Sequence, residues 1–369
     1  MTGTGYTRNA IDKMLGVLAV DSFATPSNPA DGAHDDYLLN AALTQVKLDT
    51  YPRTLVFANR AYNFSNTYLL NRDGLKFLGG STMEREFRET NKIKCPAGGL
   101  FQFAGSAYRD YKFQGLAFEA SSSGVWMPSF ATDNTAGSWQ DVDITQCGFQ
   151  GFSSIFSGTT LRMDINRTYI NGATNTQLTV GGSDNKFFTY GRCYSSGTLP
   201  SNKPWFDFGV SSSDINLTYV TPQTGYAAKF SYTQGGVNVY GGKSDCTGRS
   251  GGLATQQAGI LQSIPAGRSI TYYDMWVFNA GQNGASTTTS KALIMVTSGD
   301  AIFYSPNFPA TMTGTTPAVA NIPGIYAASG CKVRVYSPKA ENGGYKHLRQ
   351  AVAGGIWCDD TSWTIDTAA

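Results

Sequence analysis

The most constraining feature of this 369-residue sequence is a change of hydrophobic period between residues 31 and 80. Residues 35–46 (DDYLLNAALTQV) predict a short helix, because Asp35 or Asp36 can cap its N-terminus and apolar residues follow at helical spacing. That apolar stripe consists of Leu38, Leu39, Ala42, Leu43 and Val46. From residue 55 onward, short apolar runs (LVF, YNF, YLL, LKFL) alternate with Asn, Arg, Asp and Gly, which is typical of short strands joined by tight corners. One helix followed by many such strands predicts a parallel β-helix, because the open end of a stacked core must be covered.

Similar segments recur after residue 80, for example GLAFEAS, GVNVYGG, SITYYDMWVF, DAIFYS and CKVRVYS. Their spacing is irregular at roughly 20 to 35 residues, as expected for solenoid coils with loops inserted in some of them. In such a fold, each inward side chain stacks on its counterpart in the next coil, which buries a continuous core.

The chain ends differ from this pattern. Residues 7–20 (TRNAIDKMLGVLAV) predict a second amphipathic helix, followed by a linker that contains proline. We therefore predict a helical attachment segment and linker over residues 1–24, and a parallel β-helix over 25–340 with its capping helix at 35–46. Residues 341–369 are predicted to form a C-terminal cap or an extension between subunits.

The composition excludes several classes of protein. The net charge is +2 and only 15% of residues are charged, against about 25% in a typical domain. The sequence has no basic cluster that would neutralise phosphates, so we expect no nucleic-acid partner. No apolar run approaches the ~20 residues that span a bilayer, and the N-terminus does not resemble a secretory leader. We expect a soluble protein that does not insert into membranes and is not exported by a cleaved signal.

The sequence contains no metal or cofactor motif. The six cysteines are widely spaced without a C-x-x-C pair, which favours small buried side chains over a zinc site or a disulfide framework. The only two histidines, His34 and His347, stand at opposite ends of the chain, which argues against a histidine-based catalytic or metal centre. We therefore predict neither a metal nor a cofactor.

Carboxyl groups are the only candidates for catalysis. Cleavage of a glycan needs two of them, about 5 to 9.5 Å apart. Asp141 and Asp143 are two residues apart on one predicted strand, which places both on the same face about 7 Å apart. The candidates are Asp141, Asp143, Asp207 and Asp245, with Asp164 and Asp214 as partners from other coils. Stacked strands lie about 4.8 Å apart, so chance pairs of Asp are frequent, and the catalytic residues stay unassigned.

Aromatic residues in and beside the Gly- and Ser-rich loops supply a second kind of candidate site. Sugar binding needs aromatic surfaces for C–H groups, together with amide, carboxylate and guanidinium groups for hydroxyls. We predict ligand-binding roles for Trp126, Trp139, Trp205, Tyr272, Trp276 and Arg192, with Tyr273 and Arg109 as further residues of suitable type.

Two parts of the sequence also resemble phage proteins. The patterns Asp31-Gly32, Asp35-Asp36, Ala41-Ala42-Leu43, Leu55-Val56-Phe57 and Leu75-Lys76-Phe77-Leu78-Gly79-Gly80 resemble the first segment of the pectate-lyase-like right-handed β-helices found in bacteriophage tail spikes. The Gly-Ala pair that opens the family pattern is missing, and residues 58–61 (ANRA) replace its Pro and Gly. The opening GYTRNAIDKMLGVLA resembles the start of minor tail proteins from phages of mycobacteria and related actinobacteria.

The resemblance implies a homotrimeric virion protein at the tail tip that binds host surface polysaccharide during adsorption. Residues 1–20 would attach it to other tail or baseplate proteins. Two alternatives stay open. One is a depolymerase, either a glycoside hydrolase or a polysaccharide lyase, that acts on capsule or cell wall. The other is a purely structural baseplate component.

Overall fold

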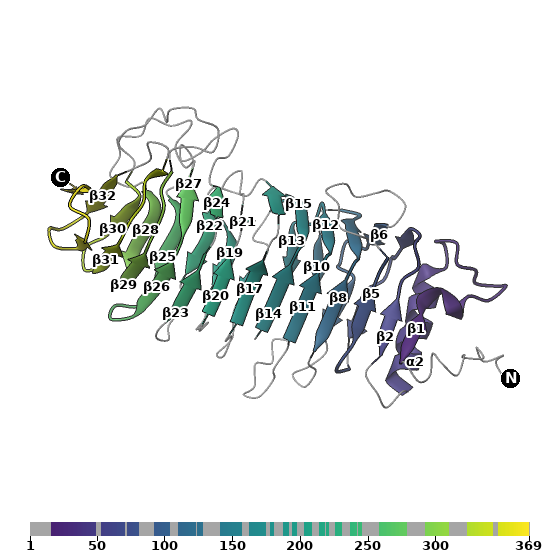
Figure 1. Cartoon of the computed structure of the whole chain (residues 1–369). Helices are drawn as coiled ribbons and strands as arrows, with labels where there is room; N and C mark the ends of the chain where they lie inside the picture. Colours follow the sequence, from purple (N-terminus) through teal and green to yellow (C-terminus); the bar gives the residue numbers. More distant parts are fainter. Residues whose placement is uncertain are drawn as a thin grey trace. The chain divides into compact units, whose positions relative to one another are not determined.

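The chain folds as a right-handed parallel β-helix, as predicted, with strands from successive coils stacked side by side in the computed structural model (Figure 1). The chain divides into two compact units, residues 1–170 (unit 1) and residues 171–369 (unit 2). The structure describes residues 16–48, 53–70, 72–80, 92–103, 110–122, 124–127, 141–156, 162–174, 178–180, 187–191, 194–197, 203–208, 214–217, 219–220, 226–230, 237–241, 243–245, 258–278, 292–309, 323–341 and 346–368.

In the part of unit 1 that the structure describes, one α-helix and one short 3-10 helix accompany the stacked coils. Its elements are β1 (Val17–Ala19), η1 (Val20–Phe23), α2 (Asp35–Leu48), β2 (Thr54–Val56), β3 (Tyr62–Asn63), β4 (Tyr68–Leu70), β5 (Lys76–Leu78), β6 (Lys92–Cys95), β7 (Phe101–Phe103), β8 (Tyr111–Gln114), β9 (Ala117–Ala120), β10 (Val125–Met127), β11 (Asp141–Thr145), β12 (Gly148–Gln150), β13 (Ser154–Phe156) and β14 (Arg162–Asn166). One sheet has the order β1-β2-β5-β8-β11-β14, and a second has β3-β6-β9-β12. The pairs β4-β7 and β10-β13 lie on the third side of the coils.

Unit 2 repeats this plan, and β15 (Tyr169–Ala173) crosses the boundary in sequence. Its strands are β16 (Leu178–Val180), β17 (Phe187–Gly191), β18 (Tyr194–Gly197), β19 (Pro204–Phe208), β20 (Asp214–Leu217), β21 (Tyr219–Val220), β22 (Tyr226–Phe230), β23 (Val237–Tyr240), β24 (Lys243–Asp245), β25 (Ala258–Ser263), β26 (Ser269–Tyr273), β27 (Trp276–Phe278), β28 (Ala292–Ser298), β29 (Asp300–Tyr304), β30 (Ile325–Ala327), β31 (Val333–Tyr336), β32 (His347–Gln350), β33 (Ile356–Cys358) and β34 (Thr364–Thr367). The long sheet of unit 2 has the order β17-β20-β23-β26-β29-β31-β33. An eight-stranded sheet from β16 to β34 and the sheet β21-β24-β27 form the other sides.

The chain ends follow the coils more closely than predicted. The predicted helix over 7–20 is wrong for residues 17–20, because β1 pairs in parallel with β2 and Val20 begins the 3-10 helix; residues 7–15 lie outside the described part. Leu18 is buried in the core, so strand pairing prevails over the helical pattern at this position. At the other end, β32, β33 and β34 continue the sheets, so residues 347–367 extend the stack.

Large aromatic side chains fill the core of unit 1. Phe77 and Phe113 occupy matching positions on β5 and β8, and their rings stack with centroids 4.8 Å apart. Trp126 is fully buried, and its ring centroid lies 5.0 Å from that of Phe113 and 4.8 Å from those of Phe118 and Phe149. The sequence pattern of inward aromatic residues thus becomes a column of stacked rings along the coils.

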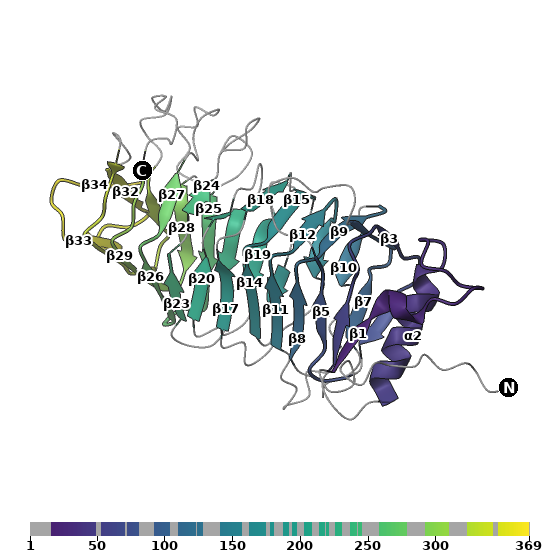
Figure 2. The same cartoon turned by 45° about the vertical axis from the view of Figure 1, so that its right-hand side comes forward.

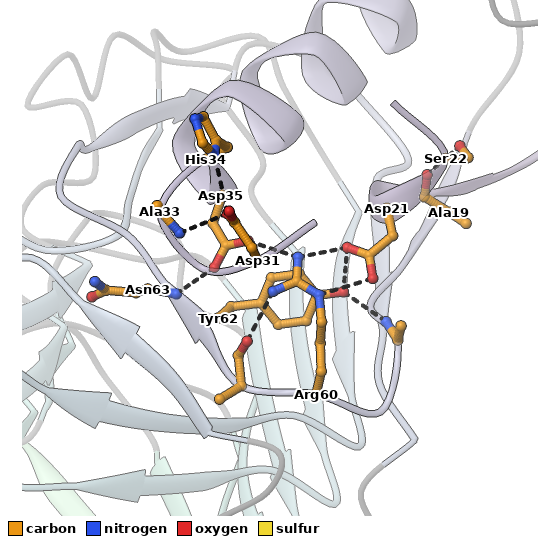
Figure 3. Close-up of polar contacts among 12 residues, drawn as sticks. Ala19, Asp21, Ser22, Asp31, Ala33, His34, Asp35, Arg60, Tyr62 and Asn63 are labelled. Atoms are coloured by element: carbon orange, nitrogen blue, oxygen red, sulfur yellow. Dashed lines mark hydrogen bonds and ion pairs between the residues drawn. The ribbon is translucent and has the colours of Figure 1, made fainter. Parts of the chain in front are cut away.

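Helix α2 lies beside β1 at the N-terminal end of unit 1 (Figure 2), and buried acids connect it to the first coil. Asp35 is fully buried and accepts hydrogen bonds from Arg60 Nη2 at 2.6 Å and from the Asn63 N–H at 2.7 Å. Arg60 also donates to Asp21 through Nε at 2.9 Å and Nη2 at 2.7 Å, and the Tyr62 hydroxyl donates to Asp21 at 3.0 Å (Figure 3). Asp35 was predicted as a possible N-cap of the helix. Among the described residues, its carboxylate instead binds Arg60 and Asn63 of the first coil.

The neighbouring acid, Asp36, performs a similar task. It accepts hydrogen bonds from the backbone N–H groups of Ser65 and Asn66 and from the hydroxyls of Ser65 and Tyr68. Partial burial alone would raise the pKa of Asp36, but these hydrogen bonds outweigh it and lower that pKa below its ordinary value. The DD pair at residues 35–36 therefore fixes the capping helix on the open end of the core.

Three of the four described cysteines agree with the predicted buried role. Cys95, Cys147 and Cys331 are free and buried, and Cys358 is free and half-buried. Burial raises the pKa of the Cys147 thiol to about 12, which keeps it protonated and unreactive at neutral pH. Cys193 and Cys246 lie outside the described residues. No described helix is long and apolar enough to cross a membrane.

Candidate functional site

The outer face of the long sheet of unit 2 carries a column of four tyrosines. Tyr240, Tyr273, Tyr304 and Tyr336 each end a strand (β23, β26, β29 and β31), and they occupy matching positions in register. Successive ring centroids are 5.0, 5.3 and 5.0 Å apart, and the rings are within 13° of parallel. We call these four residues the tyrosine column.

The period of two residues along each strand explains why the tyrosines face outward. The preceding residues, Val239, Tyr272, Phe303 and Val335, are fully buried, so the next side chain on each strand points to the opposite face. Tyr240 and Tyr304 are each 39% exposed. Because the faces of adjacent rings cover one another, the column presents ring edges and phenol hydroxyls to solvent.

The residue after each tyrosine turns the chain away from the sheet. Gly241, Asp274, Ser305 and Ser337 all have positive φ, between 49° and 60°. Three of these corner N–H groups donate to the tyrosine carbonyl of the next coil, at 2.7 to 2.9 Å. These hydrogen bonds offset the strain of the left-handed conformation at Asp274 and Ser305, and all three keep successive tyrosines in register.

Trp357 on β33 continues the aromatic surface with a different orientation. Its ring centroid lies 5.2 Å from that of Tyr336, but the two planes are inclined by 61°. The Trp357 side chain is 51% exposed, the largest exposure of any tryptophan whose burial is described. Trp357 therefore offers an aromatic face where the tyrosine column offers edges.

A second outward column of mixed chemistry runs beside the tyrosines. It consists of Asn238, Thr271, Ile302 and Arg334, which match one another in register, and Trp357 follows Arg334 in the same column. The first three side chains are half-buried and Arg334 is exposed. Phenol, hydroxyl, amide and guanidinium groups beside an exposed indole form a surface that can bind sugars through hydrogen bonds and apolar C–H contacts.

Four of the predicted ligand-binding residues lie away from this surface. The prediction is wrong for Trp126, Trp205 and Tyr272, because all three side chains are fully buried in the core. Trp276 is half-buried on β27, outside the two columns. Trp139, Arg192 and Arg109 lie outside the described residues.

Tyr273 is the one residue named from the sequence that the structure places in the tyrosine column. The signal that would have found the others is the recurrent ending of the strands: an apolar residue, Tyr, then Gly, Asp or Ser. It appears as VYG, YYD, FYS and VYS.

The carboxylate candidates lie on several strands. On β11, Asp143 pairs in register with Lys112 of β8 on one side and with Asp164 of β14 on the other. Asp143 and Asp164 are therefore neighbours in unit 1. Asp143 accepts a hydrogen bond from the Thr145 hydroxyl at 2.8 Å, and Lys112 Nζ lies 4.0 Å from its other carboxylate oxygen. Of the other candidates, Asp141 lies on β11, Asp207 on β19 of unit 2 and Asp245 on β24. Across the described residues, no group of three His, Cys, Asp or Glu is arranged to hold a metal.

Comparisons with known proteins identify similar folds. No protein-family profile and no curated protein sequence matches the chain. Among solved structures, the chain is similar to the A-module of Azotobacter vinelandii mannuronan C-5 epimerase AlgE4, with a TM-score of 0.58, 13% identity, and coverage of 95% of this chain and 97% of that one. For the A-module of AlgE6 from the same organism, the TM-score is 0.57, with 11% identity and coverage of 92% of this chain and 91% of that one. For tailspike protein 3 of bacteriophage CBA120, the TM-score is 0.49, with 12% identity and coverage of 98% of this chain and 62% of that one.

Proposed function

We propose that this protein binds polysaccharide along the outer face of the long sheet of unit 2, through the tyrosine column, the adjacent polar column and Trp357. The exposed, regularly repeated tyrosine column carries this proposal. Its rings are 5.0 to 5.3 Å apart from one coil to the next. Stacking between coils stabilises the sheet, and the same repeat presents a row of phenol hydroxyls and ring edges on the outer face.

The spacing of the coils suits a polymer rather than a single sugar. Adjacent strands lie about 4.8 Å apart, which is close to the length of one sugar unit in an extended polysaccharide. A chain that lies across the strands would meet one tyrosine hydroxyl per coil. Each contact is weak, but contacts made by one polymer at several coils add up through effective concentration.

We propose, as the biological role, that the protein is a phage tail spike or minor tail protein that binds host surface glycan at the tail tip, as a homotrimer. Its support is the resemblance of residues 31–80 to tail-spike β-helices and the parallel β-helix fold. The test is competition: purified protein should block adsorption of virions to host cells and should have the mass of three chains in solution. Absence of binding to host envelopes and of competition would reject this role.

Removal of the Trp357 indole is expected to weaken polysaccharide binding about tenfold, or about 1.4 kcal/mol, because exposed aromatic anchors carry a large share of binding energy. Isothermal titration calorimetry of Trp357→Ala with host surface polysaccharide measures the change in dissociation constant. Tyr37→Ala is the matched control, since Tyr37 on α2 is 45% exposed and lies in unit 1, outside the proposed surface. Equal losses in the two variants would contradict the proposal.

The Asp143–Asp164 register pair in unit 1 supports a second candidate function, cleavage of host surface glycan. Strand spacing of about 4.8 Å is near the carboxyl separation of retaining glycosidases, about 5 to 5.5 Å. If the pair is catalytic, Asp143→Asn with Asp164→Asn should abolish the release of reducing ends or unsaturated sugars from host glycan. Substitution of Asp207 is the comparison, and unchanged release in the double variant would exclude this pair.

A further inference from the structure

Arg334 lies next to Trp357 on the proposed binding face. It lies on β31, one coil before Trp357 in the same outward column, and Tyr336 follows two residues later on the same face. Its side chain is exposed, and the guanidinium makes no ion pair or hydrogen bond with any other described residue. A guanidinium that has no partner among the described residues therefore borders the aromatic surface, one strand away from an exposed indole.

The acids near Arg334 are already engaged by backbone groups. Asp300 accepts a hydrogen bond from the Lys332 N–H at 3.0 Å, and Asp359 accepts from the Ser337 N–H at 2.8 and 3.0 Å. The formal charges of Lys332, Arg334 and these two acids sum to zero, so the local net charge favours neither sign. What distinguishes the site is geometry, because the acids have donors while the guanidinium has no acceptor among the described residues.

We infer that Trp357 and Arg334 form a subsite for a carboxylated sugar unit, so that the polysaccharide bound by this face is an acidic one. This inference rests on the proposed function and names its ligand class. The sugar ring would lie against the exposed indole, and its carboxylate would receive the paired N–H donors of the guanidinium. Arg is the side chain best suited to this task, because its planar fork matches a carboxylate in a bidentate arrangement.

The test compares acidic polymers with their neutral forms. The 369-residue chain is titrated with polygalacturonate, hyaluronan and heparosan, each alongside its carboxyl-reduced derivative. At least one acidic polymer is expected to bind, and carboxyl reduction should weaken that binding about tenfold. Arg334→Gln should cause a similar loss and remove the difference between the two forms, whereas Arg334→Lys should retain part of it.

Controls separate this subsite from general charge effects. Lys47→Gln removes one exposed positive charge from α2 in unit 1 and should leave both affinities unchanged. Unchanged thermal unfolding of Arg334→Gln would show that the variant folds. Dextran sulfate serves as a further ligand, and tighter binding to it than to every uronate polymer would assign the subsite to sulfate and overturn the inference.

The outcomes also distinguish this inference from the proposed function. Binding of neutral polymers that depends on Trp357 but not on Arg334 would overturn the acidic subsite and leave polysaccharide binding intact. Persistence of the acidic preference in Arg334→Gln would likewise overturn it. Failure of every polymer, acidic or neutral, to bind would reject both.

Discussion

Replacement of Arg60 by Met is expected to lower the free energy of unfolding by about 3 to 5 kcal/mol, because it leaves a buried carboxylate without its cation. Asp35 is 0% exposed and would keep only its hydrogen bond from the Asn63 N–H. Asp21 would lose both donors that Arg60 supplies. The measurement is urea-induced unfolding followed by circular dichroism, and the effect should appear as a lower midpoint.

Two further variants make the Arg60 result specific. Arg60→Met combined with Asp35→Leu should recover much of the loss, since removal of both partners leaves no uncompensated buried charge. Asp31→Asn is the control, because the Asp31 side chain contacts the His34 ring on the surface of the same segment, and this substitution should leave stability unchanged. An unchanged unfolding midpoint in Arg60→Met would show that the buried contacts do not stabilise the cap.

Replacement of Trp126 by Ala is expected to destabilise the protein by about 3 to 5 kcal/mol, through lost burial and the cavity that remains. The side chain is fully buried, and its ring contacts those of Phe101, Phe113, Phe118 and Phe149. Because it lies between rings of three successive coils, the cavity would interrupt the stacked core. Chemical unfolding monitored by tryptophan fluorescence and circular dichroism measures the effect.

Trp357→Ala is the matched control for Trp126→Ala and should show the opposite behaviour. Trp357 is half exposed, so its removal should weaken polysaccharide binding with little effect on unfolding. Trp126→Ala, at a temperature where it remains folded, should bind normally. A Trp126→Ala variant that is as stable as the original protein but binds polysaccharide more weakly would contradict the role of Trp126 as a core residue.

Elements that are determined by nearby residues in the sequence could be predicted, whereas those that depend on pairing with distant strands could not. The helix predicted over 35–46 is present as α2, which ends at Leu48. The short apolar runs after residue 54 are strands, because alternation and corner residues act over only a few positions. Residues 17–20 were mispredicted, since their apolar spacing fits a helix equally well and only pairing with β2 selects the strand.

The binding face was predictable in residue type but not in position. Aromatic residues and arginine were expected, yet the chosen Trp126, Trp205 and Tyr272 are core residues. A tryptophan in a sequence rich in Gly and Ser can point inward or outward, and that choice depends on strand register and on which coil covers it. Tyr272 and Tyr273 illustrate this, because adjacent side chains on β26 lie on opposite faces.

The sequence by itself determined the parallel β-helix and its capping helix, because hydrophobic period and corner residues are local properties of the chain. Only the tertiary structure decided which aromatic residues form a surface, since residues from Tyr240 to Trp357 come together through the register between coils. The same holds for Arg60 and Asp35, whose contact depends on how the cap lies on the first coil. Contacts between residues far apart in sequence are fixed by packing, which no local pattern records.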